Sequence, residues 1–328
     1  MSDFNIGIVG TGSIASCFSK AIHRVPGCCA YGVSSRTKEK GNVFAIENDI
    51  KHVYAGIDLM LADPNIDLVY IAVPHPFHYE NALKAVEAGK AVLCEKPICI
   101  SGKQAETLFE KARDKRVFIA EGMWTRYLPT SQKALQWIRD GRIGEIKFID
   151  GCFSFAVDPV NPKPRLVDPD KGGGAMFDLG VYTVEMASFY ARALPSGYSG
   201  FNTSFCYGTD ASSVLALKYP NDILATLRMG IVCETSSTMT IFGTKGRIEI
   251  PGFCAANDVY LFNNDRAAFV EDYHATCDQP QGFTWQIEAV KGYVENGYLE
   301  SPVITQEESI VTAKILGNMM HQFYPNRY

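Results

Sequence analysis

The stretch NIGIVGTGSIA, residues 5–15, decides the fold of the first part of the chain. Residues 5–9 form a short apolar run, which predicts a β-strand that ends at Gly10. Beyond Gly12, apolar residues recur at helical spacing as far as Val25, and Pro26 then ends the predicted helix. A strand that passes through glycines directly into a helix is the opening of a βαβ unit.

The glycines of this stretch follow the pattern G-x-G-x-x-A, which is typical of a turn that binds a dinucleotide. Gly10 permits the tight turn, and Gly12 lets the backbone approach a pyrophosphate. The helix that begins there offers N–H groups and the positive end of its dipole. Glycine-rich turns also arise for steric reasons alone, but this one lies at the first strand–helix joint of an alternating series. We therefore predict cofactor contacts at Gly10, Gly12, Ser13 and Ile14.

The remainder of the first third continues this alternation. Residues 68–73 are a continuous apolar run, as expected of a strand that is buried on both faces of a parallel sheet. This pattern predicts an α/β fold whose N-terminal part, residues 1–122, is a Rossmann domain with a doubly wound parallel sheet. The predicted strands are residues 5–9, 29–34, 68–73, 91–94 and 117–120, with helices over residues 14–25, 82–88 and 101–115.

From Met123 onward the pattern changes, and we assign residues 123–328 to a second domain. The turn Pro220-Asn221-Asp222 joins two long strand-like runs, as in an antiparallel meander. We therefore predict a C-terminal α+β domain with a largely antiparallel open sheet. Its predicted strands are residues 212–219, 223–233, 236–242 and 246–250, and its predicted helices are residues 131–139, 175–190, 286–295 and 307–323.

The composition is that of a globular protein with two domains. The chain has 328 residues, of which 47% are hydrophobic and 20% are charged, and its formal net charge is -5. Attraction to nucleic acid or to an anionic membrane requires dense Lys and Arg, so this charge argues against both partners. A pocket for an anionic cofactor needs only a few local donors and remains compatible with it.

The termini and the cysteines bear on the compartment. The first residues lack the basic and apolar segments of a signal peptide, and no apolar run has the length of a membrane span. The ten cysteines are scattered, several of them within apolar runs, and no C-x-x-C occurs. We therefore predict thiols in a reducing cytoplasm rather than disulfides, and no metal site.

The residues after the second predicted strand indicate which dinucleotide is bound. An NAD site usually places Asp or Glu there to accept from the ribose 2′-OH. This chain has SSRTKEK at residues 34–40 instead. Arg36 can grip a 2′-phosphate through two hydrogen bonds and Lys40 can assist, whereas a carboxylate would repel the phosphate. We predict NADP, with NAD possible; the alternative is a solvated loop with ordinary basic residues.

Two segments carry candidate catalytic groups. Lys96, in Glu95-Lys96-Pro97, follows a parallel strand at its carboxyl end, where such sheets bind ligands, and can donate to a substrate hydroxyl. Further on, KGGGAMFDLGVY (residues 171–182) places Asp178 and Tyr182 four residues apart on a predicted helix, so both project from one face. The plainer alternatives are a surface lysine, an aspartate that favours a helix dipole, and a packed tyrosine.

Taken together, the motifs resemble the glucose-fructose oxidoreductase, inositol dehydrogenase and MocA family over essentially the whole chain. The shared features occur in the family's order: the N-terminal G-x-G-x-x-A, then Glu95-Lys96-Pro97, then three glycines leading to Asp178 and Tyr182. The resemblance implies that Lys96 lies by the nicotinamide and that Asp178 and Tyr182 contact the reacting hydroxyl of the substrate.

Within that family the chain looks most like the dimeric dihydrodiol dehydrogenases and the NADP-dependent D-xylose dehydrogenases. The similar stretches are PHPFH (74–78), AGKAVLCEKP (88–97), WTR (124–126) and FGTKG (242–246). Tyr182 is shared with this branch, in which the tyrosine acts as general acid. Arg36 stands at the position where the branch binds the 2′-phosphate. The resemblance also implies cofactor contacts at Pro74, His75, His78 and Glu95 and substrate contacts at Trp124 and Arg126. His75 stands where the family usually has Asn, and His78 has the alternative of capping its helix.

The sequence therefore predicts an NADP-dependent dehydrogenase or reductase acting on CH–OH groups. It would move hydride between nicotinamide and a sugar, polyol or cyclic diol, with Tyr182 as acid/base, Lys96 lowering its pKa and Asp178 orienting the hydroxyl. A catalytically silent NADP(H)-binding sensor is the alternative. We also predict a homodimer or higher homo-oligomer through the second sheet. The residues predicted to form its apolar outer face are Met229, Ile231, Met239 and Ile241.

Overall fold

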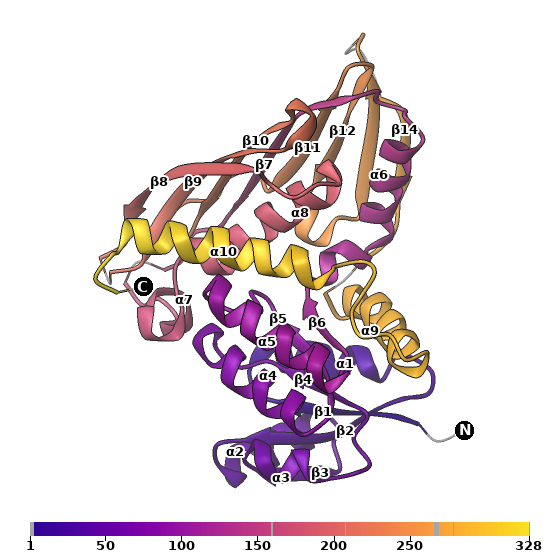
Figure 1. Cartoon of the computed structure of the whole chain (residues 1–328), viewed down its shortest axis with the longest axis vertical. Helices are drawn as coiled ribbons and strands as arrows, with labels where there is room; N and C mark the ends of the chain where they lie inside the picture. The colour runs from indigo at the N-terminus through magenta and orange to yellow at the C-terminus, as the bar shows by residue number, and fades with distance from the viewer. Residues whose placement is uncertain (1–2, 159, 207, 266–268, 278, 328) are drawn as a thin grey trace. The chain divides into compact units, whose positions relative to one another are not determined.

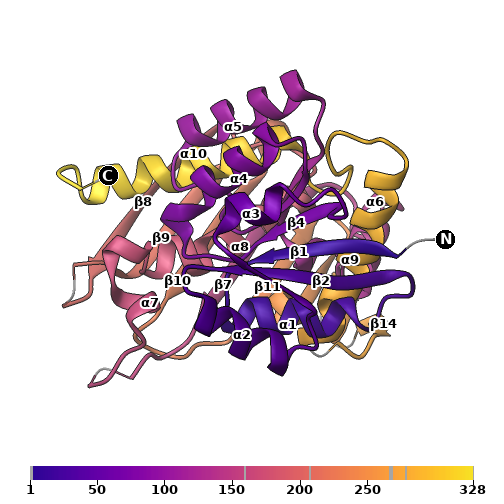
Figure 2. The ribbon, with the colours of Figure 1, turned by 90° about the horizontal axis from the view of Figure 1, so that it is seen from below.

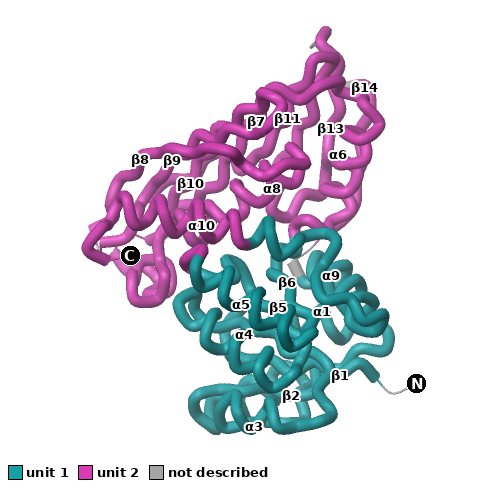
Figure 3. Tube along the Cα trace, viewed as in Figure 1, with its two compact units in different colours: residues 1–99, 103–124, 278–309 teal, residues 100–102, 125–277, 310–328 magenta. Residues whose placement is uncertain are grey.

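The computed structural model of the chain describes residues 3–158, 160–206, 208–265, 269–277 and 279–327. It divides into two compact units, which Figure 3 shows in different colours. Unit 1 comprises residues 1–99, 103–124 and 278–309, and unit 2 comprises residues 100–102, 125–277 and 310–328. Both units are thus assembled from separate segments, whereas we expected one boundary after residue 122.

Unit 1 is built on a parallel sheet of six strands in the order β3-β2-β1-β4-β5-β6. This order is that of a doubly wound Rossmann sheet, and it confirms the predicted fold class of the first domain. All four residues of the central strand β4 are buried, because helices cover both faces of the sheet. The strands are β1 (Phe4–Val9), β2 (Cys28–Ser35), β3 (His52–Ala55), β4 (Leu68–Ile71), β5 (Ala91–Glu95) and β6 (Ile119–Gly122).

Helices lie on both faces of this sheet, with α1 and α2 on one face and α4 and α5 on the other (Figure 2). A later helix, α9, packs on α1, where the ring of Phe283 meets the edge of Phe18 at 5.6 Å between centroids. The helices are α1 (Ser13–Ile22), α2 (Lys38–Glu47), α3 (Ile57–Leu61), α4 (His78–Glu87), α5 (Gly102–Lys115) and α9 (Gln279–Glu295).

The sequence did not predict β3, α2 or α3. In α2, Val43 and Ile46 point to solvent, with 57% and 83% of their surface exposed, so the helix lacks the single apolar face that the periodicity test requires. All four residues of β3 are at least partly exposed, and the strand therefore shows no apolar run. Helix α3 buries three apolar side chains, but its five residues are too few to show a helical period.

Unit 2 is built on a sheet of eight strands in the order β14-β13-β12-β11-β7-β10-β9-β8. All neighbouring strands are antiparallel except β7 and β10, which confirms the largely antiparallel sheet. Strands β9 to β12 match the predicted runs, while β7, β8, β13 and β14 were not predicted. The strands are β7 (Ile146–Ser154), β8 (Gly197–Ser204), β9 (Asp210–Lys218), β10 (Leu224–Gly230), β11 (Thr238–Gly243), β12 (Gly246–Pro251), β13 (Asp258–Asn263) and β14 (Phe269–His274).

One face of this sheet is covered by helices, among them α8 and α10 (Figure 1). Every residue of α8 is buried, and a helix without a polar face belongs to a core. A π-helical turn, η4 (Met176–Gly180), leads directly into α8 (Val181–Ala191). The other helices of the unit are the 3₁₀ turns η2 (Trp124–Tyr127), η3 (Pro169–Lys171), η5 (Pro220–Asp222) and η6 (Phe253–Ala255), then α6 (Pro129–Arg139), α7 (Pro164–Val167) and α10 (Gln306–Phe323).

The prediction of which residues form the apolar outer face of this sheet is wrong. Met229, Ile231, Met239 and Ile241 are each at most 2% exposed, because they face the helical layer of their own unit. Alternation along a strand separates two faces, but it does not say which of them the helices will cover. The face that remains open carries a different set of apolar side chains: Phe148, Phe201, Val214 and Leu224.

Candidate active site

The glycine turn after β1 leaves an open cradle at the start of α1. Gly10 has φ +115°, and a Cβ there would stand 2.4 Å from the carbonyl oxygen of Ala72, so this position requires glycine. A Cβ at Gly12 would meet no atom within 4 Å. Helix α1 begins at Ser13 with no side-chain cap and no acidic residue in its first turn. Its N-terminal amides therefore face open space, as an anion site at a helix N-terminus requires.

The end of β2 presents basic groups beside this turn. The amide of Gly10 donates to the carbonyl of Ser34 at 3.0 Å, which ties the glycine turn to the last residues of β2. Arg36 and Lys40 follow, and both are exposed. Thr37 caps α2 by accepting from the Lys40 amide at 3.4 Å. Because no carboxylate lies between residues 34 and 38, these residues fit a ribose 2′-phosphate.

The predicted cofactor residues of unit 1 share one edge of the sheet. The glycine turn, Arg36, Pro74 and Lys96 follow β1, β2, β4 and β5, and the carboxyl ends of parallel strands meet at the same edge. This is the edge at which open α/β sheets bind their ligands. The described residues of unit 1 thus fit a dinucleotide.

His78, for which the resemblance implies a cofactor contact, lies in the interior of unit 1. Its side chain is fully buried, and its two ring nitrogens lie 2.7 Å from the carbonyl oxygen of Val73 and 2.8 Å from that of Pro97. Burial lowers the pKa of His78 to about 4, although both carbonyl oxygens favour the protonated ring. The ring therefore joins the loop after β4 to the segment after β5. His75 is also buried, with its ring edge-on to His78 at 5.7 Å.

The segment that carries Lys96 is held by two buried carboxylates. Glu95 accepts from the Tyr70 hydroxyl at 2.5 Å and from the Lys96 amide at 3.3 Å, and Glu121 accepts from the amide of Ile98 at 2.9 Å. The Lys96–Pro97 peptide bond is cis. Through these contacts Glu95 helps to fix the backbone at Lys96. The cofactor contact that the resemblance implies for Glu95 stays a prediction.

Two of the three glycines before η4, Gly173 and Gly174, lie close to other atoms of the same unit. A Cβ on Gly173 would lie 2.9 Å from the carbonyl oxygens of Leu166 and Asp168. Gly174 has φ +110°, and a Cβ there would come within 2.1 Å of Oδ1 of Asp210. These two glycines therefore allow close approach of the backbone and of a buried carboxylate of the same unit.

Asp178 and Tyr182 lie on the continuous segment formed by η4 and α8. Arg165 pairs with Asp178 through two contacts, from Nη1 to Oδ1 at 3.1 Å and from Nη2 to Oδ2 at 3.2 Å. The ring of Tyr182 meets the edge of Phe153 at 5.6 Å. π-Helical turns are frequent at functional sites, and this one carries the carboxylate just before the phenol. Sequence order alone could not place Arg165, which lies in a proline-rich segment.

Trp124 and Arg126, for which the resemblance implies substrate contacts, are both buried in the structure. Arg126 is fully buried and forms an ion pair with Glu185, with Nη2 and Oε2 2.5 Å apart. Its guanidinium also lies 5.2 Å from the ring centre of Phe189. Trp124 is 3% exposed, and its ring packs on Phe283 at 5.2 Å. Both side chains belong to a core, which a motif match cannot distinguish from a pocket wall.

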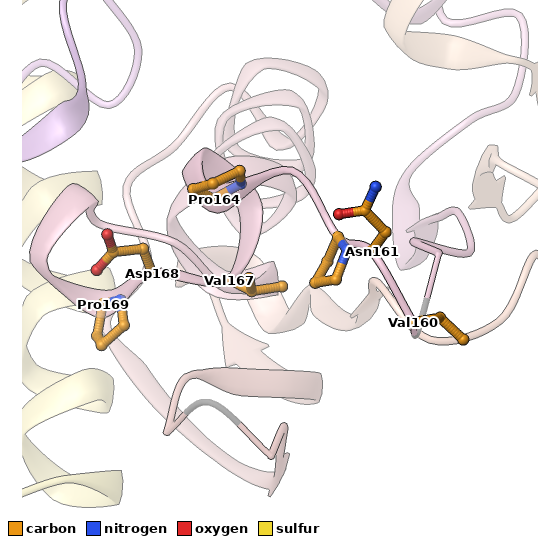
Figure 4. Close-up of a pocket in the computed structure, with 7 residues that line it drawn as sticks. Val160, Asn161, Pro164, Val167, Asp168 and Pro169 are labelled. Atoms are coloured by element: carbon orange, nitrogen blue, oxygen red, sulfur yellow. The ribbon is translucent and has the colours of Figure 1, made fainter.

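A hollow of about 400 Å³ lies in the segment between β7 and η3 (Figure 4). Pro164, Val167 and Pro169 supply apolar walls. Its carboxylate, Asp168, is paired with Lys171 at 2.6 Å. Among the described residues that line the hollow, Asp168 is the only ionisable side chain.

The described residues contain no group of three His, Cys, Asp or Glu side chains arranged to hold a metal ion. No helix in the same part of the chain combines the length and the apolar character needed to cross a membrane.

Comparisons with known proteins match both units. The family described as "Oxidoreductase family, NAD-binding Rossmann fold" matches residues 4–123, and the "GFO/IDH/MocA C-terminal domain" matches residues 131–249. Trans-1,2-dihydrobenzene-1,2-diol dehydrogenase from Macaca fuscata fuscata is 28% identical over 316 residues, which cover 94% of this chain and 94% of the relative.

Solved structures share the fold. Levoglucosan dehydrogenase, in complex with NADH and levoglucosan, has a TM-score of 0.89 at 18% identity, covering 100% of this chain and 98% of that one. A 3-ketoreductase from Actinomadura kijaniata, in complex with NADP and TDP-benzene, has a TM-score of 0.82 at 23% identity, covering 96% of each chain. With both halves of the sequence matched in order and both sheets in place, the chain belongs to the Gfo/Idh/MocA family of oxidoreductases.

Proposed function

We propose that this chain is an NADP-dependent dehydrogenase or reductase that acts on a CH–OH group of a sugar, polyol or cyclic diol. The observation that carries the proposal is the η4–α8 segment, where a carboxylate held by Arg165 precedes a phenol on one helix. A carboxylate and a phenol so placed can orient a hydroxyl and exchange its proton. The substrate class is supported by the dihydrodiol and levoglucosan dehydrogenases to which the chain is similar.

The proposed reaction assigns one task to each of three side chains. In oxidation, Tyr182 accepts the hydroxyl proton while the carbon loses hydride, and in reduction it returns that proton to the carbonyl oxygen. Lys96 donates a hydrogen bond to the same oxygen and favours the ionised phenol. Asp178, fixed by Arg165, orients the hydroxyl. A bound nicotinamide supplies the hydride acceptor or donor.

The preference for NADP over NAD rests on the residues after β2. Arg36 is exposed beside the glycine turn, and no acidic side chain stands at the end of that strand to accept from a ribose hydroxyl. The related structures bind NADH in one case and NADP in the other. The Arg36 guanidinium, assisted by Lys40, is therefore the group that we propose to select the phosphate.

The function is tested by two measurements in sequence. Fluorescence titration with NADPH and NADH should show tighter binding of NADPH by at least fivefold. A screen of aldoses, polyols and trans-dihydrodiols with NADP⁺, and of the matching carbonyl compounds with NADPH, should then find turnover. If NADPH bound tightly but none of these compounds were turned over, the protein would be a catalytically silent NADP(H)-binding protein. A preference for NADH would overturn the role of Arg36.

We further propose that two copies associate through the open face of the unit 2 sheet. Phe148 and Leu224 are paired across β7 and β10 and are 51% and 46% exposed, and Val214 on β9 is 46% exposed. Apolar side chains that share one sheet face mark an interaction surface. Sedimentation should give a dimer or a larger assembly, which Leu224→Asp should disrupt. A monomer for the unaltered chain at micromolar concentration would contradict this.

All ten cysteines, each within the described residues, keep their thiol groups. Burial raises the pKa of the Cys28 thiol to about 11 and that of Cys99 beyond the usual range, so these thiols resist ionisation. We propose a reducing compartment, the cytoplasm, as the place where the protein works.

A further inference from the structure

A buried carboxylate, Asp210, lies behind the helical segment that carries Asp178 and Tyr182. Asp210 opens β9 and has no exposed surface. Its Oδ2 accepts from the amide of Met176 at 2.7 Å and from the Ser213 hydroxyl at 2.9 Å. Met176 is the first residue of η4 and lies 34 positions earlier in the chain. A distant strand thus supplies the N-terminal cap of η4, which lacks a cap from its own preceding side chain.

The loop before η4 is shaped around the same carboxylate. Gly174 has φ +110°, and a Cβ at that position would stand 2.1 Å from Oδ1 of Asp210. Any other residue at position 174 would therefore collide with the carboxylate as well as adopt a strained backbone conformation. Glycine at position 174, the third of the Gly172-Gly173-Gly174 motif, therefore leaves the space that the Asp210 carboxylate occupies.

This arrangement has a cost. Burial raises the pKa of Asp210 to about 6, although Ser213 and the amides of Met176, Asp210 itself and Ala175 all favour the ionised form. These donors are neutral, so the buried charge is compensated by dipoles alone. The carboxylate fixes the direction of the first amide of η4. π-Helical turns are rare in proteins, so this contact stabilises an unusual geometry.

We propose that Asp210 is a positioning residue for the reaction proposed above: through the Met176 amide it fixes η4, and thereby the directions of Asp178 and Tyr182. Met176 lies two positions before Asp178 and six before Tyr182 on one continuous helical segment. If η4 relaxed towards regular α-helix, the angle between side chains four residues apart would change. The Asp178 carboxylate and the Tyr182 phenol would then no longer meet one hydroxyl together.

The groups around Asp210 set the pH range in which it acts. The η4 side offers backbone amides, and its own strand offers the Ser213 hydroxyl. After α10, burial raises the pKa of the Tyr324 phenol and the Asp210 carboxylate adds to this, so Tyr324 stays neutral near pH 7. Arg327, close to Gly208, forms an ion pair with Asp170 at 3.2 Å. Protonation of Asp210 on going below about pH 6 removes the charge that holds the Met176 amide.

The test compares Asp210→Asn with Ser213→Ala. The first keeps the size of the side chain and removes its charge, whereas the second removes a hydrogen bond to the same oxygen and leaves the Met176 contact. We expect Asp210→Asn to lower kcat at least tenfold with a change of less than twofold in the Kd for NADPH, and Ser213→Ala to stay within about twofold of the unaltered chain in both. In the unaltered chain kcat should fall below about pH 6, and in Asp210→Asn this limb should be absent.

A second readout does not depend on the proposed function. Amide hydrogen exchange over residues 174–184 should be faster in Asp210→Asn than in Ser213→Ala, because the negative charge that strengthens the cap of η4 is lost. Equal exchange and equal kcat in the two variants would overturn the positioning role. If the unaltered chain turned over no substrate, the proposed function would fail, and the exchange measurement alone would decide the role of Asp210.

Discussion

Arg165 grips Asp178 through two nearly parallel contacts, from Nη1 to Oδ1 at 3.1 Å and from Nη2 to Oδ2 at 3.2 Å. A fork of this kind fixes the plane of the carboxylate as well as its position. The Arg165 side chain is 52% exposed and the Asp178 side chain 10%, so the pair contributes more to orientation than to stability. Asp178 is therefore held at both of its oxygens before any substrate arrives.

Replacement of Arg165 by Met should lower kcat about tenfold, because the carboxylate loses its fixed plane. Arg165→Lys keeps the positive charge without the fork and should recover only part of the loss. Lys163→Met, two residues away on the same exposed segment, is the matched control. Steady-state kinetics check this, and normal turnover in Arg165→Met would remove the pair from the reaction.

Lys96→Met should reduce turnover by two or more orders of magnitude, on the order expected for loss of a group that acts in proton transfer. NADPH should still bind, because the glycine turn and Arg36 are unaltered. Lys84→Met is the control, since Lys84 pairs with Asp58 on the surface of the same unit. Turnover is measured beside a fluorescence titration; a variant that retained full kcat would exclude Lys96 from catalysis.

Arg36→Ala should weaken NADPH binding at least tenfold, about the worth of one charged bidentate contact to phosphate, and should change NADH binding little. Lys38→Ala tests the neighbouring exposed cation, for which no cofactor contact is proposed, and should leave both affinities near their original values. Titration of each variant with both cofactors decides the matter. Parallel losses for NADPH and NADH would mean that the side chain supports the loop and does not select the phosphate.

His78 makes the stability of the protein depend on pH. Burial lowers the pKa of His78 to about 4, below its unfolded value near 6.5, so the unfolded chain takes up a proton that the folded chain does not. The free energy of unfolding therefore decreases as the pH falls from about 6.5 towards 4. The decrease that His78 causes between pH 7.5 and pH 5 is about 2 kcal/mol. Asp210 acts in the opposite direction, because its pKa is raised to about 6 and its contribution is lost as the pH rises.

Urea unfolding of His78→Asn and of the unaltered chain separates the two effects. Asp210 is common to both proteins, so the difference in unfolding free energy between them should shrink by about 2 kcal/mol on going from pH 7.5 to pH 5. A constant difference over this range would show that His78 is protonated in the folded protein.

Replacements at Arg126 and Glu185 test whether the Arg126 side chain belongs to the core or to a substrate pocket. Because Arg126 and Glu185 are both fully buried, Glu185→Ala should leave an uncompensated charge and destabilise the protein by about 3 to 5 kcal/mol. The double replacement of Arg126 and Glu185 by Met should regain most of this loss. Denaturant unfolding measures both. If the double variant had the stability of the unaltered chain but a changed KM for substrate, Arg126 would be a substrate contact.

Sequence patterns predicted the parts of the fold in which apolar periodicity is strong. The buried run of β4 and the glycine turn after β1 decide the Rossmann sheet, and both are local. Edge elements such as α2 escaped prediction because Ile46 lies on its solvent face. The second sheet was predicted as antiparallel, but β7 and its parallel partner β10 lie far apart in sequence, and no local pattern encodes their pairing.

Motif matches located the candidate site residues without saying which way their side chains face. His78 and Arg126 occupy the expected positions, yet they are directed into the interior. The groups that hold the η4–α8 segment are Arg165, in the short helix α7, and Asp210, at the start of β9. Neither position has a distinguishing neighbour in sequence, because such contacts arise only when distant segments fold together.

The contact between Phe18 and Phe283 has a consequence for biosynthesis. The ribosome makes the chain from its N-terminus, so the first strand, glycine turn and helix emerge some 260 residues before the aromatic ring that covers that helix. During this interval the apolar side of α1 that α9 covers lacks that cover. This part of unit 1 is therefore completed only after residue 283 has been made.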